Sequence, residues 1–161
     1  MGDPNEALVE AKRLLRGEMR RLRRSLPDRA ERSQRAVGHL VAVEGIAGAR
    51  RLMAYDSVVG EVDLSDLVSW ARARDIEVMM PEDGVAPEWP DVIVVPGVAF
   101  TARGERLGQG GGWYDRFLPQ RRPDCVVVGV GFAEQVLDTV PVADHDVRLD
   151  GIVTDDGPIW R

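Results

Sequence analysis

The chain has few of the residues that build thiol and metal sites. Its 161 residues include one cysteine, Cys125, and two histidines. No internal disulfide can form, and a structural zinc site with the usual cysteine and histidine ligands is excluded. Cys125 opens an apolar run, so we expect a core residue in a protein of a reducing compartment. No spacing of serine, cysteine and histidine indicates a hydrolase, and His145, between two aspartates, is interpreted as structural.

Long apolar runs are also missing. No stretch could span a bilayer, and the first residues are polar and acidic where a signal peptide would be basic and then apolar. The net charge of −6 argues against general affinity for nucleic acids. We therefore expect a cytoplasmic monomer that binds neither membrane nor nucleic acid. The length and the 44% hydrophobic content predict one domain over residues 1–161.

Lysine is nearly absent, because Lys12 is the only lysine among 21 basic residues. An ammonium group acts as a point charge on phosphate, where arginine forms a planar fork. On a helical wheel of about 100° per residue, Lys12, Arg16 and Arg23 border an apolar stripe and could reach a neighbouring cleft. The stripe comprises Leu8, Leu15, Met19, Leu22 and Leu26, and the arginines expected in solvent are Arg13, Arg20, Arg21 and Arg24.

Apolar segments of two kinds alternate along the chain. Short runs predict strands, and segments with a period near 3.6 predict helices. The pattern predicts an α/β fold with three layers, in which helices cover both faces of a largely parallel sheet. The predicted strands are 52–55, 76–80, 91–95, 125–130 and 151–154. Three helices are predicted: the first ends at Pro27, the second runs from Pro27 or Asp28 to Gly45, and the third spans 64–74.

A glycine-rich segment follows the strand predicted at 91–95. It reads RLGQGGGWYDRF from Arg106 to Phe117, and a short helix is expected from Trp113 to Leu118. Backbone N–H groups at the start of a helix suit phosphate. No Lys-Ser or Lys-Thr follows the glycines, so a Walker A loop is excluded, and a tryptophan replaces the third glycine of a dinucleotide fingerprint. A plain surface turn is the alternative, and the charges of Arg106, Asp115 and Arg116 argue against it.

Several separated segments carry a resemblance to one family. The segment VPGVAFTARGERLGQGGGWYDRFLP, which contains the glycine loop, resembles the signature of the 5-formyltetrahydrofolate cyclo-ligases, also called methenyltetrahydrofolate synthetases. The resemblance extends to 12–16, 55–63 and 140–150. Trp113 stands where family members commonly have tyrosine, and Gln109 where an aromatic residue is frequent.

The resemblance implies a reaction. It is the ATP- and Mg²⁺-dependent closure of 5-formyltetrahydrofolate to 5,10-methenyltetrahydrofolate, through phosphorylation of the formyl oxygen. The expected partners are ATP and a reduced folate. By resemblance, Asp115 and Asp150 are the magnesium ligands, and Asp56, Glu61 and Tyr114 bind the substrate. The nucleotide is assigned to Lys12, Arg16, Arg106, Leu107, Gly108, Gln109, Gly110, Gly111, Gly112, Trp113 and Tyr114, of which Lys12, Arg106 and Tyr114 are also the predicted catalytic residues.

Other roles remain open for single residues of this set. Without the resemblance, Asp115 would be a helix-start residue, Tyr114 a core tyrosine and Glu61 a loop acid. The chain also departs from the family between Pro81 and Asp91, where members usually carry a longer segment over the folate. Two further hypotheses follow. One is a divergent nucleotide-binding relative with another small substrate or without cyclo-ligase activity, and the other is an anion- or RNA-binding module that uses Arg20, Arg21 and Arg24.

Overall fold

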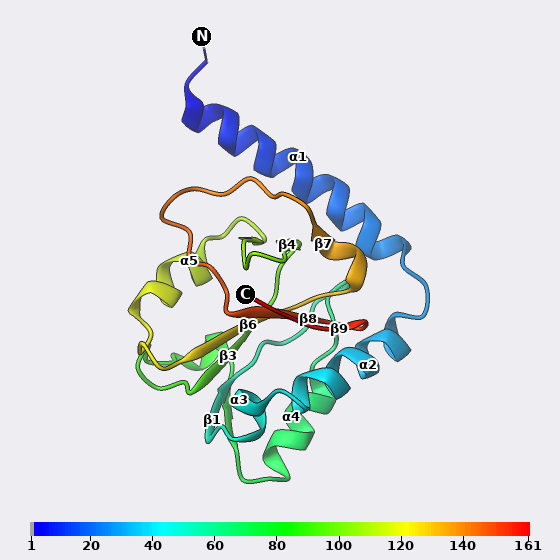
Figure 1. Ribbon diagram of the computed structural model, residues 1–161, viewed down its shortest axis with the longest axis vertical. Coiled ribbons are helices and arrows are strands. Elements are labelled where there is room, and N and C mark those ends of the chain that lie inside the picture. Colours follow the sequence, from blue (N-terminus) through cyan, green and yellow to red (C-terminus); the bar gives the residue numbers. More distant parts are fainter. Residues whose placement is uncertain (1) are drawn as a thin grey trace.

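Six strands form the central sheet of the computed structural model, which describes residues 2–161 (Figure 1). The order is β2-β1-β3-β6-β8-β9. All neighbours are parallel except β9, which runs antiparallel to β8 at the edge of the sheet. The largely parallel sheet predicted from the sequence is confirmed, and the edge strand β9 was not predicted. The bounds are β1 (Arg51–Met53), β2 (Glu77–Met79), β3 (Val92–Val95), β6 (Val126–Val130), β8 (Gly151–Thr154) and β9 (Gly157–Trp160).

Helices cover both faces of this sheet, as the three-layer prediction requires. On one face, α2, α3 and α4 share a hydrophobic core with side chains of β1, β3, β6 and β8. On the other face, α5 and the 3-10 turn Leu118–Gln120 pack through Phe117 and Leu118. The helices are α1 (Pro4–Ser25), α2 (Arg29–Val41), α3 (Glu44–Ala47), α4 (Ser65–Arg72) and α5 (Trp113–Phe117). The helix predicted to reach Gly45 is interrupted, because Val43 is extended and buried in the core.

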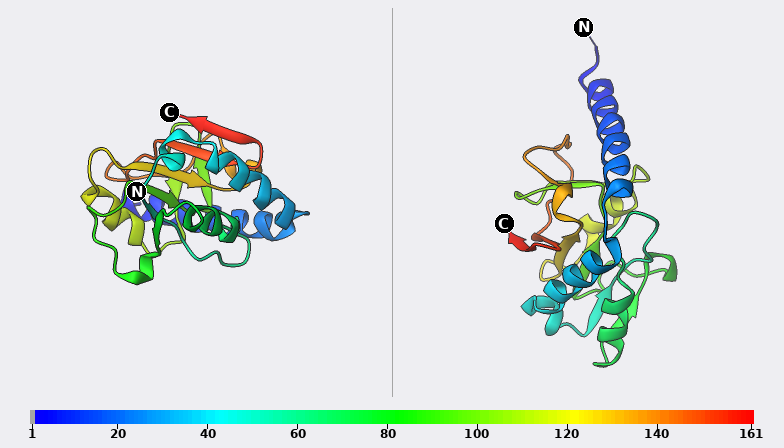
Figure 2. Two further views of the ribbon diagram at one scale, coloured as in Figure 1. Left: turned by 90° about the horizontal axis from the view of Figure 1, so that it is seen from below. Right: turned by 90° about the vertical axis from the view of Figure 1, so that its right-hand side faces the viewer.

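The first helix covers a second, smaller sheet. Three short strands, β4 (Ala99–Thr101), β5 (Arg106–Leu107) and β7 (Val136–Leu137), pair in the order β5-β4-β7. Met19, Leu15 and Leu22 of α1 pack against it. Strands of two or three residues have no readable periodicity, so the sequence did not predict this sheet. Since β4 follows β3 in the chain and β7 follows β6, the second sheet lies at the carboxyl end of the central sheet, and α1 covers it there. The first turns of α1 extend beyond the rest of the chain (Figure 2).

Cys125 is a core residue, as expected. Its side chain packs on the α5 face, and the residue is 3% exposed. Burial raises the pKa of the thiol to about 11. Since the thiolate is the reactive species, this shift disfavours reactivity of Cys125 at neutral pH. Within residues 2–161, no helix is long and apolar enough to cross a bilayer.

A buried ion-pair network joins α2 to the end of β8. Arg32 Nε donates to Asp155 Oδ2 at 2.7 Å, and its guanidinium also binds Glu134. The Asp155 side chain is 3% exposed. Burial opposes ionisation of Asp155, but the hydrogen bonds from Arg32 and the Ala133 N–H outweigh it and lower the pKa of this carboxyl group.

Replacing Arg32 by alanine is expected to lower the free energy of unfolding by about 3 kcal/mol, because it removes the nearer of two guanidinium groups from the buried Asp155 carboxylate and leaves Arg35 3.6 Å away. Urea denaturation at pH 7 measures the loss. The stabilisation from Asp155 is present above the ordinary carboxyl pKa and is lost as the pH falls through the lowered pKa of the folded state. Arg50→Ala, on the surface, should change stability by no more than about 0.5 kcal/mol. Equal stability of the two variants would refute this role of the network.

Candidate functional site

Two arginines of α1 hold the glycine loop from above. Arg16 Nε donates to the Gly108 carbonyl at 2.8 Å, and Arg20 donates to the Gln109 carbonyl at 2.8 Å. Arg20 also contacts the Gln109 side chain. The expectation that Arg20 lies free in solvent is therefore wrong. The helical wheel placed Arg20 outside the leucine stripe, but the glycine loop also contacts the face of α1 that carries Arg20.

The N–H groups of the loop are left unused. Arg116 Nη1 donates to the Gly111 carbonyl at 3.0 Å, so three loop carbonyls are bound by arginines. In the part of the chain that the structure describes, no backbone N–H from Gly108 to Gly112 donates to another protein group. Gly110 and Gly112 have φ values of 111° and 71°, which favour glycine. A run of free N–H groups beside bound carbonyls is typical of an anion-binding loop.

Arg106 forms the floor of the loop. Its side chain is 8% exposed, its Nε donates to the Pro96 carbonyl at 2.8 Å, and its Nη1 lies 3.6 Å from Asp115 Oδ1. The guanidinium also lies over the Tyr114 ring at 5.1 Å. Burial lowers the pKa of Arg106, although arginine stays charged at any physiological pH. The predicted residues Arg106, Tyr114 and Asp115 are thus brought together.

Lys12 meets a carboxylate that the sequence did not single out. Its Nζ lies 3.4 Å from Asp146 Oδ2, and the two side chains are 20% and 12% exposed. The Ala143 N–H donates to the same oxygen at 2.7 Å and fixes the carboxylate. Asp146 lies in the long connection between β7 and β8, which passes beneath α1 (Figure 1). The neighbouring His145 points outward, with its side chain 83% exposed.

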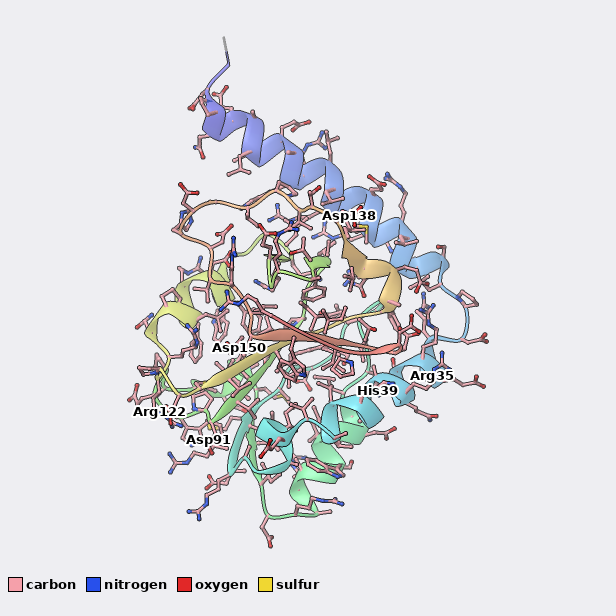
Figure 3. All side chains as sticks on the ribbon, in the orientation of Figure 1. Arg35, His39, Asp91, Arg122, Asp138 and Asp150 are labelled. Carbon is pink, nitrogen blue, oxygen red and sulfur yellow. The ribbon has the colours of Figure 1, made fainter. Side chains whose placement is uncertain are left out.

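Asp150, the predicted partner of Asp115, lies elsewhere. It precedes β8, at the amino-terminal edge of the sheet, and its Oδ2 accepts from the Val127 N–H at 2.8 Å. The glycine loop follows β5 of the smaller sheet, and none of its residues within 2–161 lines the cavity that Asp150 lines. Figure 3 shows Asp150 beside the central strands, well apart from α1. The structure therefore does not show Asp150 beside Asp115, and the assignment of these two residues to one magnesium ion stays a prediction.

Asp150 instead lines a separate cavity of about 580 Å³. His39 of α2, Cys125 and Trp160 of β9 form other parts of its wall. None of the predicted nucleotide or substrate residues reaches this cavity.

The predicted substrate residues line a groove of about 900 Å³ between the β1–α4 connection and α4. Asp56 and Glu61 both belong to its wall. Glu61 Oε1 accepts from the Val58 N–H at 2.9 Å, and burial raises the pKa of this carboxyl group. The third predicted substrate residue, Tyr114 of α5, lies beneath the Arg106 guanidinium and does not line this groove, and burial raises the pKa of its hydroxyl.

The short segment between Pro81 and Asp91 packs against the protein. It begins with a 3-10 turn, Pro81–Asp83, and Val85 is buried on the α5 face of the sheet. Trp89 packs there as well, 5.9 Å beneath the Arg51 guanidinium. Trp89 is partly buried against the core, and of the residues described between Pro81 and Asp91 only Asp83 contributes to the groove.

The site can thus bind a polyanion beside an organic group. Free N–H donors, Lys12, Arg16 and Arg106 suit phosphates. Magnesium favours oxygen ligands and is usually held by one or two carboxylates together with phosphate oxygens. Asp115, 3.6 Å from Arg106, and Asp146, which lines a small cavity together with Arg106, provide such carboxylates. No cluster of three or more metal-binding side chains occurs within residues 2–161.

Comparison with known proteins connects this site to one family. Residues 83–155 match the model of the 5-formyltetrahydrofolate cyclo-ligase family. The 5-formyltetrahydrofolate cyclo-ligase of Mus musculus is 30% identical over 106 residues, which are 61% of this chain and 50% of that protein. The Escherichia coli K12 protein of the same name is 42% identical over 73 residues, 44% of this chain and 39% of that protein. The match thus spans half or less of these two relatives.

The structural similarity covers more of the chain. The solved 5,10-methenyltetrahydrofolate synthetase of Aquifex aeolicus superposes with a TM-score of 0.80 at 26% identity, covering 92% of each chain. The synthetase of Mycoplasma pneumoniae gives 0.79 at 24% identity, covering 89% of this chain and 98% of that one, and supports the fold alone. The resemblance found in the sequence is confirmed.

Proposed function

The chain is a relative of the 5-formyltetrahydrofolate cyclo-ligases, and from this premise we propose that it converts 5-formyltetrahydrofolate to 5,10-methenyltetrahydrofolate with ATP and Mg²⁺. The observation that carries the proposal is the glycine loop, whose carbonyls are bound by arginines while its N–H groups remain free. Arg106 lies against the loop at Gly108, and Lys12 lies one helical turn before Arg16 on α1. A loop of this kind fits the triphosphate that the reaction needs.

The chemical difficulty is the weak electrophile. A formamide carbon resists attack by the neighbouring aniline nitrogen, and its oxygen leaves poorly as hydroxide. The formyl oxygen attacks the γ-phosphorus, and ADP departs. The nitrogen then attacks the activated carbon, and phosphate leaves with the former formyl oxygen while the nitrogen releases its proton to solvent. Catalysis of such a transfer consists mainly of positioning and charge neutralisation.

The residues of the site divide these tasks. The loop N–H groups and Arg16 orient the phosphates, and Lys12 and Arg106 neutralise charge that develops on the transferred group. Asp115 and Asp146 would hold magnesium, which when bound neutralises phosphate charge. Glu61, in the groove, would accept the adjacent N–H donors of a pterin. Tyr114, next to Arg106, would lie against the folate between this groove and the glycine loop.

The direct test is the absorbance of the methenyl product. Wild-type protein with 5-formyltetrahydrofolate, ATP and magnesium near neutral pH should form it, and omission of ATP should stop its formation. No product at high enzyme concentration would refute the proposal.

A divergent relative is the second candidate, because the shortened segment leaves the groove without the longer cover of the family. Such a protein would bind Mg-ATP but not 5-formyltetrahydrofolate. Calorimetric titration with each ligand separates the two candidates, since the cyclo-ligase requires heat of binding with both.

A further inference from the structure

A buried charge without a partner lies beneath the substrate groove. Arg23, in the last turn of α1, is 4% exposed, and its Nε and Nη1 atoms have no hydrogen-bond partner within residues 2–161. A buried guanidinium without a partner costs free energy, so a role that offsets this cost is expected. A basic residue at a helix carboxyl terminus has a simpler explanation in the helix dipole, but the dipole does not require burial.

The backbone turn before Glu61 lies directly on Arg23. Gly60 has a φ of 93°, and a Cβ atom there would lie 3.6 Å from Arg23 Cβ and Nε. Arg23 and Glu61 form no salt bridge, yet they lie close enough for the charge of each to act on the other. Glu61 projects into the groove above, while the guanidinium stays below the turn.

We propose that Arg23, buried against the turn that carries Glu61, is a positioning residue that keeps Glu61 ionised for the substrate without touching the substrate itself. The inference rests on the proposed function, in which Glu61 accepts N–H donors of the pterin. A protonated carboxyl group would lose one of the two acceptor oxygens that such a fork requires.

The other groups around Glu61 cannot take over this task. Burial raises the pKa of Glu61, whereas Arg23 and the Val58 N–H lower it. Tyr55 at the end of β1 and Tyr114 of α5 are neutral and lie on its other sides. Arg29 and Arg72 also line the groove, but neither forms a salt bridge with Glu61 within residues 2–161. The carboxylates of Asp56, Asp63 and Asp83 in its wall carry negative charge. Arg20 and Arg24 face Arg23 and lower its pKa.

The test compares Arg23→Met with the wild type. Methionine is similar in volume and uncharged, so the variant should unfold at the same or a higher urea concentration. Its KM for 5-formyltetrahydrofolate should rise by about tenfold or more at pH 6 and return toward the wild-type value at pH 9, because the pKa of Glu61 increases. The KM for ATP should not change. Arg23→Lys should recover most of the loss, and Arg24→Met, on the exposed neighbour, should behave as wild type.

A second readout does not depend on activity. The ¹³C signal of the Glu61 carboxyl group, assigned with Glu61→Gln, should titrate at a higher pH in ligand-free Arg23→Met than in wild type. Unchanged titration and an unchanged pH profile would overturn the inference, as would a loss of folate affinity that is equal at all pH values. If the wild type bound no folate, the proposed function would fail, while the carboxyl titration would still decide the role of Arg23.

Discussion

Replacing Lys12 by alanine is expected to lower kcat by about 10²- to 10³-fold, the loss typical when one preorganised charge-stabilising group is removed. Lys12 is the only lysine of the chain, it lies one helical turn before the loop-binding Arg16, and its ammonium is 3.4 Å from Asp146. The fold should be retained, since the side chain is partly exposed and contributes little to the core. Steady-state kinetics with saturating ATP, together with circular dichroism, measures both effects.

The matched control for Lys12 is its neighbour in sequence. Arg13 pairs with Glu10 on the outer face of α1, and both side chains are more than half exposed. Arg13→Ala should therefore leave kcat within about twofold, because surface substitutions away from the site change little. A wild-type rate in Lys12→Ala would remove this residue from the proposed mechanism.

The second large effect is expected at the two carboxylates beside Arg106. Asp115→Asn and Asp146→Asn should each lower kcat/KM for Mg-ATP by about 10²-fold or more, because a neutral amide holds magnesium more weakly and stabilises less charge. Asp146→Asn also weakens the pair with Lys12. Measuring the rate against magnesium concentration shows whether excess metal restores part of the activity.

Asp150→Asn is the comparison that distinguishes the structure from the sequence-based prediction. Its carboxylate binds the Val127 N–H at the far edge of the sheet, so the substitution should affect stability modestly and the magnesium dependence not at all. Loss of magnesium dependence in Asp150→Asn, with normal kinetics in Asp146→Asn, would contradict the arrangement described above.

The difference between Asp146 and Asp150 shows what the sequence could not provide. The β7–β8 connection has no periodicity, and its aspartates are indistinguishable until the path of the chain is known. Asp146 is fixed by the Ala143 N–H and contacts Lys12, whereas Asp150 lies directly before β8 and accepts from the Val127 N–H. A choice between carboxylates four residues apart depends on tertiary structure.

The central fold was predictable for the opposite reason. Apolar runs such as Val92–Val95 are buried on both faces of the sheet. A continuous apolar run of this length is typical of a parallel strand between two layers of helices, so the sequence indicates it directly. The second sheet was not predictable, because strands such as β5 contain only two residues and depend on α1 for their burial.

The anion-binding role of the glycine loop was predicted from composition, but the contacts that hold the loop in place were not. The sequence indicated an anion site from four glycines and two flanking charges. The structure adds that arginines from α1 and α5 bind the loop carbonyls and leave the N–H groups free. Arg20 was assigned to solvent because a helical wheel cannot show a loop that approaches a second face of the helix.

The most direct measurement follows the backbone amide signals of ¹⁵N-labelled protein during titration with magnesium and a non-hydrolysable ATP analogue. The largest shifts should occur at Gly108, Gly110, Gly111 and Gly112, with none around the Asp150 and Trp160 cavity. Binding of the analogue with unshifted glycine amides would contradict the assignment of the phosphates to this loop.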